Sequence, residues 1–493
     1  MSDFLETADN REELNRYVIE PVSRVEGHGK VTLLADDDNN IHEVRMHIVE
    51  FRGFERFIQG RHYQEIPVLV QRLCGICPVS HHLAAGKAID MIAGVDQITP
   101  TADKLRNLVH FGQILQSHAL HLFHLSSPDL LFGFESEIQK RNVVAVIKEH
   151  PDLAMQGVKL RKYGQEIIRI ICGKRVHGTG AIPGGMNKPL SQEDRNYLLK
   201  DVQQIIEWSI SAVKLVQNYF NENLPTSAEF ATIDSNYLSL VNPQGGLELY
   251  DGAIRVKDQE GEIIFDQLSD KEYFKYIHEE VRNWSYMKFP YLVEKGMQNG
   301  WYRVGPLARV NNCDFIPTPI AEDARKEFSN YGAGKPVRST MAYHWARMIE
   351  MLHCAESIEE LLNDPEILGT DLVVEGEQRN MGIGVIEAPR GTLFHHYEID
   401  DDELIKKANL IVSTTSNNQA MNESIRQVAS NYMNGKTITE PLLNNIEVAI
   451  RAYDPCLSCA THAMGKMPLQ VELRHTSGKL IHQLTKTSSG KFE

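Results

Sequence analysis

The sequence predicts a mainly α-helical protein with small peripheral β-sheets, an α+β fold. Segments with apolar side chains at helical spacing occupy most of the chain, and the longest are 192–222 and 339–362. Runs that alternate between apolar and polar residues are short and lie between these segments. The 493 residues show no internal repeat, low-complexity tract or clear linker, which favours one large domain over a series of modules.

The predicted strands are short and mostly pair with a neighbour in sequence. Residues 31–34 and 42–49 flank a turn at 36–40, a pattern that indicates a β-hairpin. Residues 1–17 precede this hairpin, and their polar, acidic character predicts a mobile lead-in. Further strands are predicted at 248–256, 262–265, 381–387, 392–399 and 410–415.

Helices are predicted over most of the remaining chain. Their expected ranges are 65–73, 79–92, 102–125, 137–148, 159–172, 192–222, 270–286, 321–331, 339–362, 419–432 and 441–453. The third of these contains His110, His118, His121 and His124, which we interpret as hydrogen-bonded helix histidines. The glycine-rich stretch 177–185 lacks the spacing and the Lys-Ser/Thr ending of a nucleotide loop, so it predicts a tight backbone turn.

Composition excludes several classes of protein. A net charge of −15 and a pI near 5.8 argue against a nucleic-acid binder. No apolar run approaches the ~18 residues of a membrane-spanning helix, and the polar N-terminus lacks the apolar core of a secretory signal. Seven cysteines are too few for a disulfide framework, which fits a reducing cytoplasm. Cys172, Cys313 and Cys354 stand alone and are interpreted as buried apolar residues.

Two Cys-x-x-Cys pairs lie near opposite ends of the chain, Cys74 with Cys77 and Cys456 with Cys459. Four thiolates form a soft donor set that suits zinc, an iron–sulfur cluster or nickel. A zinc ribbon keeps its two pairs about 15–20 residues apart, so this spacing favours a metal centre that is closed across the whole fold. Two unrelated redox or structural pairs, or a chance pattern, remain alternatives.

Six motifs in order resemble the large subunit of nickel–iron hydrogenases. They are residues 24–28 (RVEGH), 51–55 (FRGFE), 72–77 (RLCGIC), 305–309 (GPLAR), 387–391 (EAPRG) and 454–462 (DPCLSCATH). The resemblance implies a single domain over residues 1–462 with the helical core of that subunit. It also implies catalysis of reversible heterolytic cleavage of H2.

Finer matches resemble the cytoplasmic bidirectional NAD-reducing branch. They are residues 77–82 (CPVSHH), 123–129 (FHLSSPD) and 390–397 (RGTLFHHY). The chain has no NAD-binding motif and no further cysteine set for iron–sulfur clusters. The resemblance therefore implies a small partner subunit with at least one [4Fe–4S] cluster, and diaphorase subunits that carry FMN, further clusters and the NAD site.

The resemblance also assigns roles to the four cysteines. All four would bind nickel, and Cys77 and Cys459 would also bridge to an iron that carries carbon monoxide and two cyanides. Cys456 would be the first proton acceptor, and Glu26 would pass the proton outward. A buried carboxylate beside a thiol suits such a relay. The alternative for Glu26 is an ion pair with Arg24 or a contact within the hairpin.

Further residues match positions around the metals. Arg390 would place a fixed cation beside them, with Pro389 adjacent, Asp454 as its ion-pair partner and His81 near the bridging Cys77. His82 has no such match and is interpreted as a helix residue. Many relatives carry an aspartate immediately before the histidine that His118 matches, whereas this chain has Ser117. Carboxylate pairing around Arg390 is therefore expected to be poorer here.

A second ion and a processing site are also implied. Glu55, the carbonyl of Leu410 and His462 match ligands of a magnesium-type ion, although iron or another divalent ion stays possible. After nickel insertion, which involves a maturation chaperone, an endopeptidase would cut between His462 and Ala463. Residues 463–493, with a hairpin expected at 470–474 and 479–482, would then be removed. The alternative is an ordinary extension that stays attached.

Other functions within this resemblance remain open. The electron acceptor could be F420, NADP or polysulfide instead of NAD. A non-catalytic relative would typically lack the cysteines, and a sensor relative would usually lack the C-terminal extension.

Overall fold

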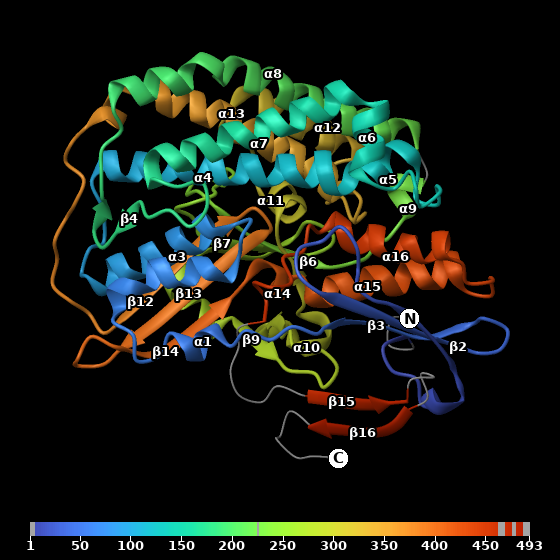
Figure 1. Ribbon diagram of the computed structural model, residues 1–493. Coiled ribbons are helices and arrows are strands. Elements are labelled where there is room, and N and C mark those ends of the chain that lie inside the picture. The colour runs from blue at the N-terminus through green and yellow to red at the C-terminus, as the bar shows by residue number, and fades with distance from the viewer. Residues whose placement is uncertain (1–4, 224–225, 462–468, 476–479, 487–493) are drawn as a thin grey trace.

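The computed structural model describes residues 5–223, 226–461, 469–475 and 480–486. Figure 1 shows a layer of long helices above small sheets and shorter helices. This layer contains α4 (Pro100–Leu120), α7 (Pro151–Cys172), α8 (Gln192–Glu222) and α13 (Ala342–Asn363). Helix α4 packs on α7 and α13, and α13 also packs on α8, so α13 is enclosed by its neighbours.

Local sequence explains where these helices begin. The hydroxyl of Thr99 accepts a hydrogen bond from the backbone N–H of Ala102, at the start of α4. The hydroxyl of Ser191 does the same for Asp194 at the start of α8. Each side chain satisfies one of the N–H groups that lack a partner within the helix.

Helix α4 continues into a wider π-helical segment, His121–Ser126, and then into α5 (Ser127–Phe132). Two hydroxyls hold the widened turn, since Ser126 Oγ lies 3.0 Å from His121 Nε2 and Ser127 Oγ donates to the carbonyl of Phe123. Such segments often occur at functional sites. This one changes the direction in which the following residues face.

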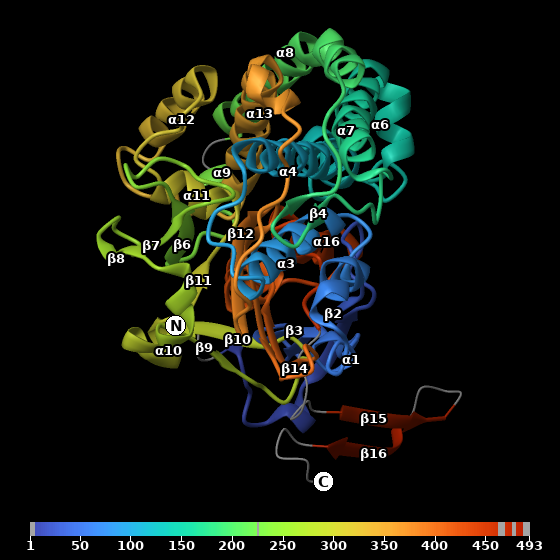
Figure 2. The ribbon, with the colours of Figure 1, turned by 90° about the vertical axis from the view of Figure 1, so that its left-hand side faces the viewer.

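The central sheet is antiparallel, with β12 (Met381–Ala388), β13 (Gly391–Ile399) and β14 (Ile405–Ile411) in that order. Helix α3 (Pro78–Ile92) packs directly on β12 and β13 (Figure 2). Glycine allows this approach, because a Cβ atom on Gly384 would lie only 2.0 Å from the carbonyl oxygen of Ala84. The start of α3 therefore lies close to the turn that joins β12 and β13.

The other sheets are small. They are β1–β2–β3 (Asn15–Ile19, Gly29–Ala35, Ile41–Ile48), β11–β6–β7–β8 (Tyr302–Arg303, Asn236–Val241, Ala253–Lys257, Ile263–Leu268), β9–β10 (Ile277–Glu280, Phe289–Leu292), β4–β5 (Ala181–Ile182, Gly185–Met186) and β15–β16 (Leu469–Arg474, Leu480–Lys486).

Shorter helices complete the described fold. They are α1 (Phe54–Phe57), α2 (Ile66–Leu69), α6 (Val143–Glu149), α9 (Thr226–Glu229), α10 (Gly296–Asn299), α11 (Pro306–Asn312), α12 (Pro319–Tyr331), α14 (Ser413–Ser416), α15 (Asn418–Val428) and α16 (Glu440–Ala452). None of the helices in the described residues combines the length and apolar character that crossing a membrane requires.

The predicted fold class is confirmed, and so are several elements. The first hairpin forms β2 and β3, the 177–185 stretch forms the tight β4–β5 turn, and the tail forms the β15–β16 hairpin. Helix α8 spans the predicted 192–222 without a break. The lead-in is shorter than expected, because residues from Asn15 onward already pair with β2.

Three predictions of secondary structure are wrong. Residues 65–73 form α2 between two short 3₁₀ turns. Residues 270–286 form a 3₁₀ turn and strand β9, because pairing with β10 overrides the local helical pattern. The strand expected from residue 248 begins only at Ala253, because the Glu248 carboxylate accepts three consecutive backbone N–H groups in a turn. A further strand, β6, lies outside the predicted set; it is buried along its whole length and shows no alternation.

Candidate metal centre

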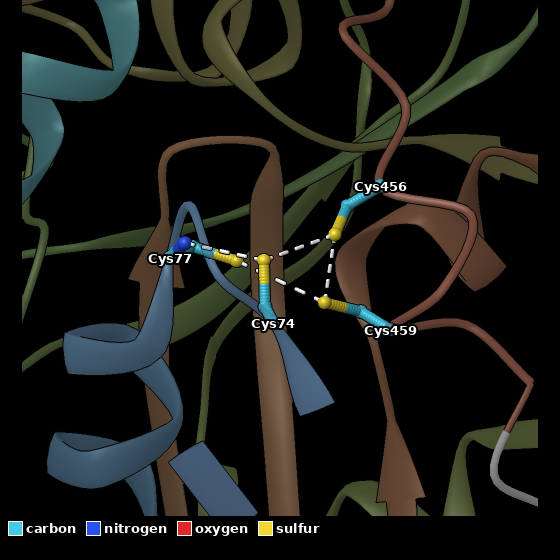
Figure 3. Close-up of side chains that lie close together, drawn as sticks. All are labelled: Cys74, Cys77, Cys456 and Cys459. Carbon is cyan, nitrogen blue, oxygen red and sulfur yellow. Dashed lines mark hydrogen bonds between the residues drawn. The ribbon is translucent and has the colours of Figure 1, made fainter. Parts of the chain in front are cut away.

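The fold brings the two cysteine pairs together (Figure 3). Cys74 follows the 3₁₀ turn after α2, and Cys77 immediately precedes α3, where Pro78 occupies the first position. Cys456 and Cys459 lie just after α16. The four sulfur atoms all lie within 4.8 Å of one another, and the four side chains are buried.

Individual distances show a compact cluster. The Sγ atoms of Cys74 and Cys456 are 3.3 Å apart, those of Cys77 and Cys459 are 3.9 Å apart, and those of Cys456 and Cys459 are 2.7 Å apart. Thiolates at these distances would repel one another unless a cation lay among them. The donor set is soft, so it fits a soft metal ion.

Protonation of the cluster supports the same fit. Burial raises the pKa of Cys456 and Cys459 well above that of a free thiol. Burial also acts to raise the pKa of Cys74, but hydrogen bonds from the other thiols outweigh it and lower that pKa. In the absence of a cation the cluster therefore keeps some of its protons, and metal binding would release them.

A small cavity of about 10 Å³ adjoins the cluster, with the room of about one water molecule. It is lined by Cys77, Ser80, His81, Ala388, Pro389, Arg390, Leu393, Val412, Ser413, Thr414, Cys456 and Cys459. Nη1 of Arg390 is buried and has no hydrogen-bond partner among the described residues. A cavity with an unused buried donor suits small ligands that accept hydrogen bonds.

Glu26 lies directly against the second cysteine pair. Cys456 Sγ donates to Glu26 Oε2 at 2.9 Å, and the backbone N–H of Ser458 donates to the same oxygen at 3.2 Å. The hydroxyl of Ser458 donates to Glu26 Oε1. Gly27 allows this approach, since a Cβ there would lie 2.7 Å from the backbone nitrogen of Ser458 and its φ is +84°.

Arg24 does not pair with Glu26, so that alternative is wrong. Its guanidinium donates to the carbonyl of Leu125 at 2.8 Å and to Asp129 Oδ1 at 2.6 Å. Asp129 also accepts from Arg451 at 2.5 Å. Both acceptors belong to the π-helical segment and α5, so this region anchors the loop that carries Glu26.

Arg390 occupies the turn between β12 and β13. Its Nε donates to the backbone carbonyl of Asp454 at 2.5 Å, and its Nη2 lies 3.2 Å from Asp454 Oδ1. Burial raises the pKa of Asp454 against the opposing charge of Arg390. Ser117 is buried on α4, and its hydroxyl finds no hydrogen-bond partner within the described part of the chain.

His81 is buried beside the cavity, and its Nδ1 lies 3.1 Å from His395 Nε2. His395 Nδ1 in turn lies 2.5 Å from the hydroxyl of Tyr397. His82 faces elsewhere: its Nε2 accepts from the backbone of Gly180 and Ala181. The interpretation of His82 as a residue without a role at the metal agrees with these contacts.

Two of the three expected ligands of the second ion lie together. The backbone N–H of Leu410 donates to Glu55 Oε1 at 2.9 Å, and Glu55 is buried. His462, and the processing site between it and Ala463, lie outside the described residues.

Sequence comparison decides the family. The nickel-dependent hydrogenase family matches residues 52–133 and 248–462, and a family described as HoxL-like matches residues 16–51. The chain belongs to the nickel-dependent hydrogenase family. Among curated relatives of this hydrogenase, the NAD-reducing hydrogenase HoxS subunit beta of Cupriavidus necator is 44% identical, over 95% of this chain and 99% of the relative. A subunit of the vhc F420-non-reducing hydrogenase of Methanococcus voltae is 42% identical, over 96% and 100%.

Solved structures agree with this assignment of the hydrogenase. An NAD⁺-reducing [NiFe]-hydrogenase in the H2-reduced state is 54% identical with a TM-score of 0.89, and the match covers 91% of this chain and 99% of that one. The Ni-Fe-Se hydrogenase of D. vulgaris Hildenborough matches with a TM-score of 0.74 at 23% identity, over 91% and 100%, which shows the same fold. The protein is thus a nickel–iron hydrogenase large subunit, and the four-cysteine cluster fits its nickel and iron.

Several residues around the hydrogenase site are not predicted from the sequence. Ser458 lies between the two cysteines of its pair, and this position could have indicated its contact with Glu26. Thr414 accepts from the backbone N–H of Cys456 at 2.9 Å, but a threonine next to a predicted strand gives no signal of this. Arg309 belongs to one of the six motifs, but the motif does not indicate that it lies behind the Pro389–Arg390 turn.

Proposed function

We propose that this chain catalyses the reversible conversion of H2 into two protons and two electrons, and that the electrons pass through a partner iron–sulfur subunit to NAD. The observation that carries the proposal is the 2.9 Å contact between Cys456 Sγ and Glu26 Oε2 inside the four-thiol cluster. It joins a metal-binding thiol to a carboxylate, so a proton has a path away from the metals.

The four cysteines would hold the metals in unequal ways. Cys74 and Cys456 would be terminal ligands of nickel, and Cys77 and Cys459 would bridge nickel to an iron with one carbon monoxide and two cyanides. When bound, this pair supplies an electrophilic centre at which H2 is split heterolytically. The cavity beside Cys77 and the unused Nη1 donor of Arg390 support small hydrogen-bonding ligands at that position.

The proton would move from the Cys456 thiol to Glu26. Ser458 fixes the carboxylate through both its backbone N–H and its hydroxyl, so Glu26 stays aimed at the sulfur. Glu26 is partly exposed, whereas Cys456 is buried, which gives the relay an outward direction. A positioned acid–base group of this kind contributes about 10²- to 10⁴-fold in rate.

Arg390 would act as a fixed cation beside the metals. Its guanidinium is buried and held by Asp454, so its charge is oriented before any reaction occurs. Charges that are preorganised in a site without water stabilise developing charge at little cost in reorganisation. Pro389 and His81 line the same cavity.

The electrons would leave through other subunits. Apart from the four ligands, the chain has only Cys172, Cys313 and Cys354, which lie apart and are buried. A small subunit with a [4Fe–4S] cluster and diaphorase subunits with FMN, further clusters and NAD would complete the path. The relative of C. necator is itself one subunit of an NAD-reducing hydrogenase.

A divalent ion and a processing step complete the proposal. Glu55 and Leu410 lie together as two ligands of a magnesium-type ion, with His462 as the third. An endopeptidase, acting after a maturation chaperone, would remove residues 463–493. The cytoplasmic location expected from the sequence stays a prediction.

A second acceptor is supported by the other relatives. Several, including the M. voltae protein, are named F420-non-reducing hydrogenases, and the alpha chain of sulfhydrogenase 2 of Pyrococcus furiosus is 28% identical. Purification of the native complex distinguishes these candidates. We expect H2-dependent reduction of NAD, with nickel and iron in the large subunit. Absence of nickel would refute the metal assignment, and reduction of only another acceptor would refute the NAD assignment.

A further inference from the structure

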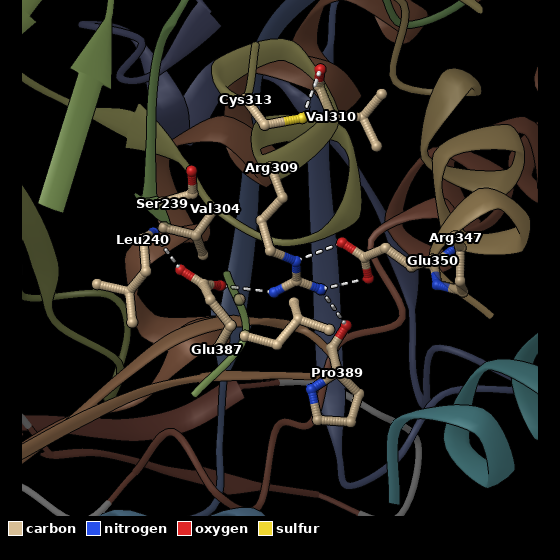
Figure 4. Close-up of polar contacts among 12 residues, drawn as sticks. Ser239, Leu240, Val304, Arg309, Val310, Cys313, Arg347, Glu350, Glu387 and Pro389 are labelled. Carbon is tan, nitrogen blue, oxygen red and sulfur yellow. Dashed lines mark hydrogen bonds and ion pairs between the residues drawn. The ribbon is translucent and has the colours of Figure 1, made fainter. Parts of the chain in front are cut away.

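Arg309, on α11, lies directly behind the turn that carries Arg390 (Figure 4). Its Nη1 donates to the carbonyl of Ala388 at 2.9 Å, and its Nη2 donates to the carbonyl of Pro389 at 3.3 Å. One planar guanidinium therefore holds the two carbonyl groups that immediately precede Arg390.

The orientation of Arg309 is itself fixed by two carboxylates. Glu350, on α13, binds it in a bidentate pair, with Nη2 to Oε2 at 2.7 Å and Nε to Oε1. Glu387, on β12, accepts from Nη1 at 2.6 Å. All three side chains are fully buried, and a bidentate pair of this kind fixes geometry as well as charge.

The carboxylates are held in turn by other elements. His118 Nε2, on α4, lies 2.9 Å from Glu350 Oε2. Glu387 Oε1 accepts from the backbone N–H of Leu240 at 2.9 Å and from the hydroxyl of Thr392 at 2.7 Å. Helices α4, α11 and α13 and strands β6, β12 and β13 thus converge on one guanidinium.

The charges in this network are stable near neutral pH. Burial acts to raise the pKa of Glu350, but the charge of Arg309 and its hydrogen bonds outweigh burial and lower that pKa to about 2. Burial lowers the pKa of His118 to about 4, so this imidazole is neutral at pH 7 and donates to Glu350.

The turn also approaches the start of α11 closely. A Cβ on Gly305 would lie 2.8 Å from the carbonyl oxygen of Arg390, and a Cβ on Gly391 would lie 2.3 Å from Val304 Cγ2. Both glycines have positive φ, +94° and +133°. The turn therefore fits against residues 304–309 without space to shift.

We propose that Arg309 is a positioning residue that sets where the Arg390 guanidinium lies relative to the four thiols. It acts through the backbone of the Pro389–Arg390 turn, and Arg390 transmits the placement to Asp454, two residues before Cys456. The inference rests on the proposed role of Arg390 beside an iron with diatomic ligands. Misplacement of a site by about 1 Å can cost about 10²-fold in rate.

Arg309→Lys in the whole purified complex tests this proposal. Lysine keeps the positive charge but cannot hold two carbonyls and two carboxylates in one plane. We expect nickel and iron contents equal to those of the unmodified enzyme, shifted infrared stretching bands of the carbon monoxide and cyanides, and H2 oxidation reduced about 10- to 100-fold.

Arg303→Lys is the matched control. Arg303 is equally buried, and its hydrogen bonds go to Ser235, Tyr237 and the carbonyls of Ile233 and Arg338, away from the turn. We expect its infrared bands to match the unmodified enzyme. Unchanged bands and turnover in Arg309→Lys would overturn the proposal, and so would an equal band shift in Arg303→Lys.

Two further measurements keep the proposal testable. If Arg309→Lys does not accumulate, Glu387→Gln removes one ionic contact and leaves the pair with Glu350; we expect a smaller band shift, and unchanged bands would overturn the proposal. If the unmodified enzyme shows no diatomic bands, the proposed function fails. The crystal structure of the variant then decides: a displaced Arg390 supports positioning by Arg309, and an unmoved Arg390 refutes it.

Discussion

At the scale of single residues, Glu26 carries the chemistry that separates this cluster from a structural metal site. Replacing Glu26 by Gln keeps the shape and the contact with Ser458 but removes the proton acceptor. We expect unchanged nickel content, H2 oxidation reduced by about 10²- to 10⁴-fold, and slower exchange of protons between H2 and solvent. Metal analysis and H2/D2O exchange measured by mass spectrometry check this.

Glu50→Gln is the control for this substitution. Glu50 lies in the same region and is also partly exposed, but its contact is with His28, 2.6 Å away. We expect its exchange rate to match the unmodified enzyme. An exchange rate in Glu26→Gln equal to that of Glu50→Gln would remove Glu26 from the relay.

At the scale of elements, Asp129 joins the loop of Glu26 to the end of α16. Its carboxylate pairs with Arg24 and Arg451, and it is buried with Arg451. Asp129→Asn leaves two cations without a counter-charge, and loss of one partner of a buried pair costs about 3–5 kcal/mol. We expect a lower free energy of unfolding, measured by chemical denaturation of the complex.

The pH dependence of this contribution follows from its pKa. Burial acts to raise the pKa of Asp129, but the charges of Arg451 and Arg24 outweigh it and lower that pKa. The stabilisation is therefore present above the unfolded value of about 3.9 and is lost as the pH falls through the folded value. Asp96→Asn, in an exposed pair with Arg379, is the control and should change the free energy of unfolding far less, because solvent screens that pair. Equal losses in the two variants would contradict the role of Asp129.

The same elements show how far the sequence alone could predict this protein. The cysteine pairs and motifs indicated the metal ligands, because thiolate chemistry requires those residue types. The partners Asp129 and Glu350 could not be predicted, since both meet their arginines only through long-range packing of α5 and α13. Strand β6 was missed for a related reason: burial on both faces removes the alternation that identifies a strand. The helix expected over 270–286 failed because strand pairing with β10 overrode local propensity.

At the scale of the whole molecule, the centre forms only when the two ends of the chain meet. The first pair lies at the start of α3, and the second pair lies between α16 and the C-terminal segment, where the backbone N–H of Arg52 donates to the carbonyl of Thr461. The β15–β16 hairpin follows this junction (Figure 1). Metal loading and the fate of residues 463–493 are therefore expected to be linked.

Intact-mass spectrometry tests this link. We expect active enzyme to end at His462 and protein from nickel-starved cells to keep residues 463–493, because an endopeptidase that recognises the loaded centre cannot act without nickel. Cys456→Ser should likewise stay unprocessed, since it removes one metal ligand. Cys313→Ala is the control: Cys313 is buried away from the cluster and donates to Val310, so its variant should be processed normally. Active enzyme with the intact 493-residue chain would refute the link, because the closed centre would then need no cleavage.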